Sequence, residues 1–176
     1  VDHYLVEGNI VYDGGTFLIG GGRPSRGIRV RDNILCNVSM QLGYSAPYNE
    51  DCEVVNNLII KGGLTINRFR QVHQESNVVV PPGGGLPESM PQVFVRPSRY
   101  DPNRAHVVII NGPKNAEVEI PLGDLAKRGI RYAMYDPRHL FDRPVIEGQI
   151  EGHEIVVPVS KEFLVWVLRV QGTHQP

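Results

Sequence analysis

Three segments of the chain superimpose without a gap: Tyr4-Leu-Val-Glu-Gly-Asn9-Ile-Val-Tyr12, Ile28-Arg-Val-Arg-Asp-Asn33-Ile-Leu-Cys36 and Cys52-Glu-Val-Val-Asn-Asn57-Leu-Ile-Ile60. Each segment begins 24 residues after the previous one, at positions 4, 28 and 52. A period of this length indicates a solenoid, in which each repeat is one structural unit stacked on the next. Because the units hold short β-branched runs between Gly and Asn and show no helical pattern, we predict a parallel β-helix.

Equivalent residues of the three repeats form columns that should stack in the solenoid. In Ile28-Arg-Val-Arg31 apolar residues alternate with arginines, which is the period of a strand with one buried and one solvated face. Asparagine tolerates the left-handed region, so we expect a corner centred on Asn33 and an amide ladder through its column. The columns contain Val6, Val30 and Val54; Asn9, Asn33 and Asn57; Ile10, Ile34 and Leu58; and Leu18, Leu42 and Ile66.

A second corner and a third strand complete each coil, which predicts a roughly triangular cross-section. The long polar connections, residues 20–27 and 43–51, are where we expect functional residues to concentrate. A shortened fourth unit carries Asn77, and the Pro/Gly-rich run that follows cannot extend a sheet. We therefore predict about three 24-residue coils plus a short fourth over residues 1–80, and a linker over residues 81–92.

The second half of the chain lacks the 24-residue period and is predicted to form a small antiparallel β-sandwich over residues 93–172. Short apolar runs alternate with turn-forming Gly, Asn, Asp and Pro, which is typical of a sandwich. Only residues 123–129 suggest a helical turn. The expected strands cover residues 92–95, 105–110, 116–120, 131–135, 145–148, 153–157 and 164–170. The fold class is therefore all-β.

Length and charge bound the function. The 176 residues carry a net charge of −1, which provides no overall attraction for nucleic acid or for an anionic membrane. No apolar run is long enough to span a bilayer. The sequence starts with neither an initiator Met nor a leader, so we expect it to begin inside a longer protein, as a mature product or a fragment.

The two cysteines lie in different columns of the repeat. Cys36 shares a column with Tyr12 and Ile60, whereas Cys52 shares one with Tyr4 and Ile28. A disulfide needs Cα atoms within about 7 Å, and opposite faces of a coil should lie about 10 Å apart. We therefore expect two buried free thiols that pack as small apolar side chains.

The pattern resembles bacterial right-handed parallel β-helix proteins of the pectate-lyase-like, carbohydrate-active kind. The similarity lies in the stacked Asn9, Asn33 and Asn57 and, in the second half, in residues 93–97, 104–111 and 144–148. The resemblance implies a C-terminal group of coils followed by a capping or sugar-binding sandwich, in a secreted or periplasmic protein. It also implies that further coils precede Val1 in relatives, with the active cleft on those coils.

Residues on the long-loop side of the coils are the candidate polysaccharide-binding residues. Arg68, Arg70 and His73 supply positive charge, which elimination from a uronate would require. Tyr44 and Tyr48 could stack on sugar rings, and Gln41 and Thr65 should point outward from neighbouring strands. A solvated basic loop explains the same residues without a ligand.

Other chemical signals are weaker. Glycoside hydrolysis needs two carboxylates about 5–10 Å apart. The outward acidic residues Glu7, Asp13, Asp32, Glu50, Asp51 and Glu53 form no stacked pair in one column, so we interpret them as solvated or turn-capping groups.

The loop with Asp136, His139 and Asp142 fits neither a zinc nor a calcium site, so we expect no metal and no cofactor.

We therefore expect the C-terminal part of a carbohydrate-active β-helix protein, of glycoside hydrolase or polysaccharide lyase type, that acts on or binds a polysaccharide. The alternative is a structural or adhesive module without catalysis. The N-terminal end of the coils, presented by Val6, Ile10 and Leu18, should be covered by upstream coils or by a second copy of the chain.

Overall fold

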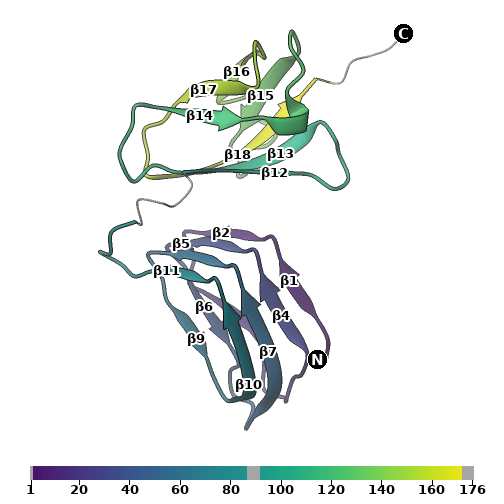
Figure 1. Cartoon of the computed structure of the whole chain (residues 1–176), viewed down its shortest axis with the longest axis vertical. Helices are drawn as coiled ribbons and strands as arrows, with labels where there is room; N and C mark the ends of the chain where they lie inside the picture. Colours follow the sequence, from purple (N-terminus) through teal and green to yellow (C-terminus); the bar gives the residue numbers. More distant parts are fainter. Residues whose placement is uncertain (1, 87–91, 172–176) are drawn as a thin grey trace. The chain divides into compact units, whose positions relative to one another are not determined.

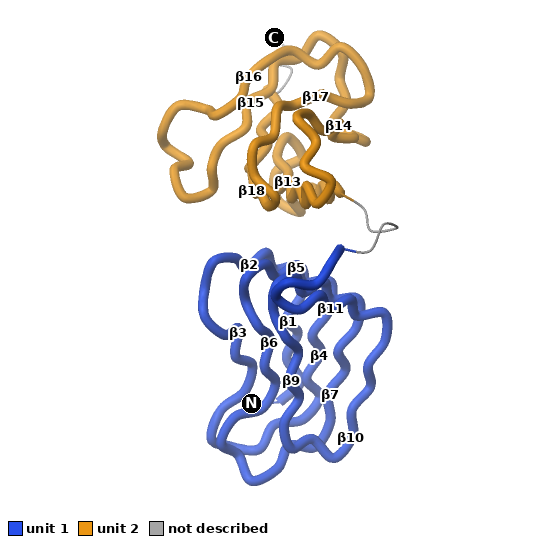
Figure 2. Tube along the Cα trace, turned by 90° about the vertical axis from the view of Figure 1, so that its left-hand side faces the viewer, with its two compact units in different colours: residues 1–86 blue, residues 87–176 orange. Residues whose placement is uncertain are grey.

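The computed structural model describes residues 2–86 and 92–171. The chain divides into two compact units, residues 1–86 and 87–176 (Figure 2). The first unit is a parallel β-solenoid of about three coils, and the second consists of antiparallel sheets (Figure 1). The predicted linker over 81–92 includes residues 87–91, which lie outside the described residues.

Three parallel sheets form the sides of the solenoid, as the three strands per coil predict. Strands of successive coils pair in each sheet, so the sheets run along the stack. The first sheet has the order β1 (Leu5–Glu7), β4 (Ile28–Arg31), β7 (Asn49–Val55) and β10 (Phe69–Glu75). The second has the order β11 (Val78–Val80), β8 (Leu58–Ile60), β5 (Ile34–Cys36) and β2 (Ile10–Tyr12), and the third β3 (Thr16–Ile19), β6 (Ser39–Leu42) and β9 (Leu64–Ile66).

The first two sheets follow the predicted columns. Val6 pairs with Val30 and Val30 with Val54, while Ile10, Ile34 and Leu58 pair in the second sheet. Their inward side chains join those of the third sheet in one core of buried residues: Ile19, Ile28, Val30, Leu35, Val38, Met40, Leu42, Cys52, Val54 and Ile59.

The third sheet has a different register from the prediction. Leu18 pairs with Gln41, and Ile19 pairs with Leu42, which in turn pairs with Ile66. Ile19 is 5% exposed whereas Leu18 is 43% exposed. The column of Leu18, Leu42 and Ile66 was therefore wrong by one residue in the first coil. The corner at residues 13–15 is one residue longer than its equivalent in the second coil, and this length shifts the strand.

The asparagine ladder forms as predicted and extends to the fourth coil. Nδ2 of Asn9 donates to Oδ1 of Asn33 at 2.8 Å, Asn33 to Asn57 at 2.8 Å, and Asn57 to Asn77 at 2.9 Å. No described residue donates to Oδ1 of Asn9 at the other end of the ladder. The expectation that a partner covers this end remains a prediction.

The left-handed residue of this corner is not the ladder asparagine. Positive φ angles occur one position earlier, at Gly8 (69°), Asp32 (57°), Asn56 (55°) and Ser76 (53°). The prediction of a corner centred on Asn33 was therefore wrong by one residue, because the backbone turns at Asp32. The ladder asparagine follows this residue and points into the solenoid, where its amide reaches the asparagine of the next coil.

Both cysteines are buried and free. Cys36 pairs with Tyr12 and Ile60, and Cys52 pairs with Ile28, in the columns that the repeat predicts. Burial, with the nearby Asp51 charge as a smaller contribution, raises the pKa of the Cys52 thiol to about 11. The thiol therefore stays protonated at neutral pH and packs as an apolar group.

The second unit packs a five-stranded and a two-stranded antiparallel sheet around one core, which is the predicted sandwich arrangement. The core draws on both sheets, for example through Val107, Trp166, Ile120 and Val157. A 3-10 turn, η1 (Gly123–Leu125), occupies part of the predicted helical turn. The larger sheet has the order β12 (Val93–Pro97), β13 (Arg104–Ile110), β18 (Phe163–Val170), β15 (Arg131–Tyr135) and β16 (Ile146–Gln149), and β14 (Glu117–Pro121) pairs with β17 (Glu154–Pro158).

Candidate functional site

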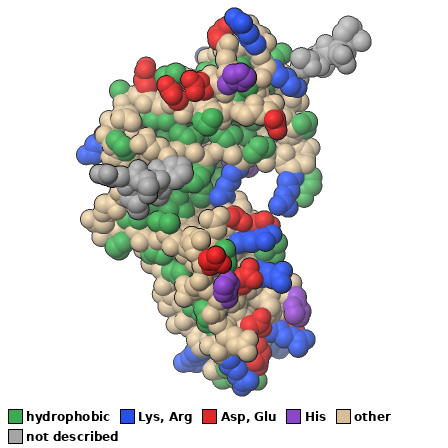
Figure 3. All heavy atoms as spheres, in the orientation of Figure 1, with side chains coloured by type: hydrophobic (Ala, Val, Ile, Leu, Met, Phe, Trp, Pro, Cys, Tyr) green, Lys and Arg blue, Asp and Glu red, His purple; other side chains and the backbone are tan. Residues whose placement is uncertain are grey.

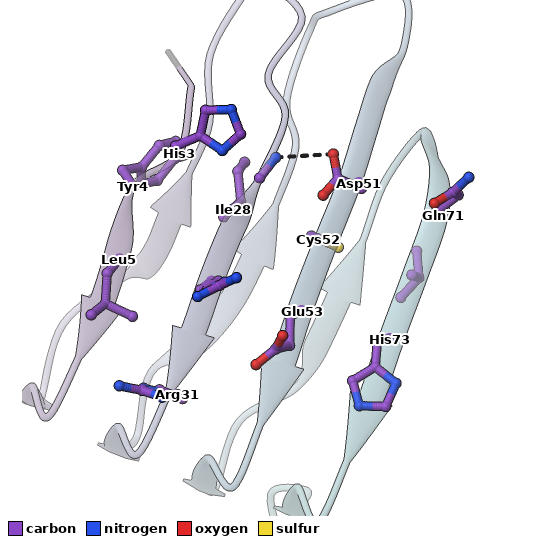
Figure 4. A pocket seen from close by; sticks show the side chains of 13 residues that line it. His3, Tyr4, Leu5, Ile28, Arg31, Asp51, Cys52, Glu53, Gln71 and His73 are labelled. Atoms are coloured by element: carbon purple, nitrogen blue, oxygen red, sulfur yellow. Dashed lines mark hydrogen bonds between the residues drawn. The ribbon is translucent and has the colours of Figure 1, made fainter.

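An open groove of about 700 Å³ lies over the first sheet of the solenoid (Figure 4). Residues from all four strands, β1, β4, β7 and β10, line it. Ile28 and Cys52 are among them although they are only 1% and 5% exposed, so the sheet itself forms the floor. The volume falls in the range of small-molecule sites, and the openness suits an extended ligand better than an enclosed one.

One outward side chain from each coil forms a row across the groove. Leu5 pairs with Arg29, Arg29 with Glu53, and Glu53 with His73. Figure 4 shows Leu5, Glu53 and His73 on the same side of their strands. Because neighbouring strands are about 4.8 Å apart, the row extends over roughly 14 Å. The solenoid thus presents an apolar, a basic, an acidic and an imidazole side chain at regular spacing.

A second row lies two residues nearer the long loops. Asp51 pairs with Gln71 on β10, and Oδ1 of Asp51 accepts a hydrogen bond from the backbone N–H of Gly27 at 3.0 Å. His3 completes this side of the groove (Figure 4). The carboxylate of Asp51 therefore stabilises the backbone of the neighbouring coil through its Oδ1 atom.

Positive and negative charges balance in the groove. Arg29 and Arg31 line the groove together with Asp51 and Glu53. Arg29 lies directly opposite Glu53, and Arg31 forms a 3.3 Å ion pair with Glu7. Figure 3 shows acidic, basic and histidine side chains intermixed along this side of the unit. Such a surface offers hydrogen-bond donors and acceptors in alternation, without a strong field of either sign.

The predicted site residues lie in three separate places. Gln41 and Thr65 pair on β6 and β9, on the outer face of the third sheet, where Nε2 of Gln41 donates to the carbonyl of Gly43 at 3.1 Å. His73 lies in the groove on the first sheet and forms a 3.4 Å ion pair with Glu75 when it is protonated. The structure does not bring these two groups onto one face.

The remaining predicted residues gather at the corner between the third and first sheets. The guanidinium of Arg70 lies 4.2 Å from the ring centroid of Tyr48 and 3.3 Å from the Glu50 carboxylate. Nη1 of Arg68 donates to the carbonyl of Ala46 at 3.3 Å, which ties it to the loop that carries Tyr44. Tyr44 is 59% exposed and Tyr48 is 40% exposed. The corner therefore offers aromatic rings, while its arginines are already engaged.

Sequence reasoning did not select the groove residues His3 and Arg29, and it interpreted Asp51 and Glu53 as solvated or turn-capping groups. Their outward orientation was predictable from the alternation of Ile28-Arg-Val-Arg31 and from the column of Cys52. The missing step was to compare acidic residues along one strand as well as down one column. Asp51 and Glu53 are two residues apart on β7, so they share a face at about 7 Å.

This separation lies within the range of the carboxyl pairs of glycoside hydrolases, roughly 5–10 Å. One oxygen of the pair is already committed, because Asp51 holds the Gly27 N–H. Within residues 2–86 and 92–171, no three His, Cys, Asp or Glu side chains gather into a possible metal site.

The chain matches no family model, no curated protein and no solved structure in the comparisons made with each. In the part of the chain that the structure describes, no helix has the length and apolar character needed to cross a membrane. The functional argument therefore rests on the groove and on the fold.

Proposed function

We propose that the first unit binds a linear polysaccharide along the groove over β1, β4, β7 and β10, as part of a carbohydrate-active β-helix protein. The observation that carries this proposal is the row Leu5, Arg29, Glu53 and His73, which lines an open groove with one side chain per coil. A polymer of repeating units is the natural ligand for a surface that repeats at a fixed spacing.

The chemistry of the row favours hydroxyl-rich sugars. Arg29 donates, Glu53 accepts, and a neutral imidazole at His73 can do both. Sugar hydroxyls are donors and acceptors at once, and Leu5, which is 49% exposed, offers contact to the apolar face of a ring. Since the groove charges balance, a ligand with few charges fits better than a polyanion.

Binding is favoured over catalysis for this chain. The hydrogen bond from Gly27 commits one oxygen of Asp51 to structure, and Arg70 is held by Tyr48 and Glu50. Hydrolysis by Asp51 and Glu53 is the second candidate, because their spacing on β7 suits a carboxyl pair. The competing class is a structural or adhesive module without catalysis, in which the sandwich binds sugar or caps the solenoid.

Calorimetric titration with a panel of neutral and acidic oligosaccharides tests the proposal. The informative variant is the double substitution Arg29→Gln and Glu53→Gln, which removes two groove groups and leaves the net charge unchanged. We expect at least one oligosaccharide to bind the original chain and the double variant to bind it about tenfold or more weakly, because two hydrogen bonds to charged groups are lost.

The matched control replaces Arg128 and Glu151, two exposed residues of the second unit, by Gln. It should bind the oligosaccharide as the original chain does. A chain that binds no oligosaccharide, or a control that is weakened as much as the groove variant, contradicts the proposal. Release of reducing ends that disappears in Glu53→Gln would instead establish hydrolysis.

A further inference from the structure

A group of positive side chains lies on the five-stranded sheet of the second unit, on the face away from its core. Ala105 and Val107 of β13 and Leu168 of β18 belong to the core, so the alternating Arg104, His106 and Arg169 point to the opposite face. The pairing register brings them together: Arg104 is directly opposite Arg169, and His106 is directly opposite Arg96 on β12.

This arrangement is electrostatically unfavourable as it stands. Like charges directly opposite each other on neighbouring strands destabilise a sheet, and Arg104 and Arg169 form such a pair. Burial, together with the positive charges of Arg104 and Arg96, lowers the pKa of His106 below its ordinary value. Arg104 therefore lies close both to Arg169 and to the imidazole, whose charged form it disfavours.

No carboxylate among the described residues forms an ion pair with Arg104 or Arg169. Nε of Arg104 is buried without a hydrogen-bond partner in the described structure. The guanidinium of Arg169 lies 5.5 Å from the ring centroid of Tyr135, which holds it by a cation–π contact. The nearest acidic side chain by strand pairing is Glu147, which is opposite Ala133 and so two strands from Arg169.

We propose that Arg104, Arg169 and His106 form a binding site for an oxyanion, such as a carboxylate, sulfate or phosphate group. Guanidinium groups match oxyanions because they offer pairs of N–H donors in a fixed plane. A bound anion would place its charge between Arg104 and Arg169, which removes their repulsion and can satisfy Nε of Arg104, a donor that now lacks a partner. Tyr135 beside Arg169 adds a ring against which a ligand can pack.

Titration of the whole chain with sulfate, phosphate, a uronate oligosaccharide and a sulfated oligosaccharide tests the site. The first readout is the NMR titration of His106, whose pKa should rise when a saturating anion neutralises the neighbouring arginines. A rise with the free ions indicates an inorganic anion site, and a rise only with the oligosaccharides indicates an acidic sugar. Both outcomes support an oxyanion site.

The second readout is the affinity of the variant Arg104→Gln/Arg169→Gln. We expect it to bind the anion about tenfold or more weakly, since charge-assisted hydrogen bonds are lost. Its melting temperature should be no lower than that of the original chain, because the substitution relieves like-charge repulsion. If the variant keeps its melting temperature but no longer binds the anion, the loss of binding is due to the two arginines and not to unfolding.

The matched control is Lys127→Gln/Arg128→Gln, which removes the same two charges from an exposed turn of the same unit. It should retain the affinity of the original chain. The proposal is overturned if no anion shifts the His106 titration, or if the control loses as much affinity as the site variant. The groove on the first unit plays no part in this test, so the two proposals fail independently.

Discussion

At the residue scale, the asparagine ladder is the feature on which the coils most depend. The Asn33 side chain is 1% exposed and donates from Nδ2 to the carbonyls of Val6 and Arg31 as well as to Oδ1 of Asn57. Its Oδ1 accepts from the backbone N–H and Nδ2 of Asn9. One amide thus satisfies polar groups on three successive coils, in a buried position where unpaired groups are costly.

The substitution Asn33→Leu should destabilise the first unit by about 3 kcal/mol or more, because it leaves several buried donors and acceptors without partners. Denaturant unfolding measures the change. The control is Asn56→Gly, which replaces an exposed residue with φ of 55° by the residue that adopts this conformation most readily. We expect the control to change stability by less than about 1 kcal/mol. Equal stability of Asn33→Leu and the original chain would contradict the ladder.

The sequence predicted the ladder but misplaced the turn by one position. Asn9, Asn33, Asn57 and Asn77 repeat without exception, so their column is visible in the sequence. The residues before them, Gly8, Asp32, Asn56 and Ser76, differ from coil to coil. Gly8, Asp32 and Asn56 belong to the residue types that adopt the left-handed region most readily, but the adjacent ladder asparagines share this tolerance, so residue type did not decide between the two positions.

At the element scale, the register of the third sheet decides whether Leu18 or Ile19 of the first coil points into the core. Leu18 and Ile19 are both apolar, so their side chains alone do not reveal which one points inward. A strict 24-residue period buries Leu18, whereas the structure buries Ile19 opposite Leu42. A single extra residue in the preceding Gly-rich corner reverses the two faces, because side chains alternate with a period of two.

Paired substitutions test this register. Ile19→Ser should cost about 2–4 kcal/mol of unfolding free energy, since it removes a buried side chain and introduces a hydroxyl into the core. Leu18→Ser should cost less than about 1 kcal/mol, because this side chain is 43% exposed. Thermal or denaturant unfolding compares the two. The reverse order of stabilities would support the strict period.

The candidate groove shows a similar limit on sequence reasoning. The columns were sufficient to place Arg29 and Glu53 outward on neighbouring strands. They did not show that Gln41 and Thr65 face a different side of the solenoid from His73, because this depends on where each corner turns. Side chains that are close in the sequence, such as Arg70 and His73, therefore belong to different surroundings.

At the scale of the whole molecule, the net charge of −1 conceals local concentrations of charge. The charges of the first-unit groove balance, whereas Arg96, Arg104 and Arg169 lie on one face of the large sheet in the second unit, with Arg104 directly opposite Arg169. From the net charge we expected no overall attraction of the chain for nucleic acid or for an anionic membrane. The sequence could not predict the second site, because the three arginines lie on three different strands.

The two units also differ in how much of their structure the sequence revealed. The repeat predicted the order of strands in the solenoid. For the second unit the strand positions were predicted, and residues 131–135 match β15, but the order β12-β13-β18-β15-β16 was not. Pairing between distant strands, such as β13 with β18, has no local signal in a single sequence.

The most direct test of the central claim is an NMR titration of the isotope-labelled chain with the oligosaccharide that binds most tightly. If the groove binds sugar, the largest shifts will occur at Leu5, Arg29, Glu53 and His73, one on each strand of the first sheet. Shifts confined to the third sheet around Gln41 and Thr65, or confined to the second unit, would contradict the account.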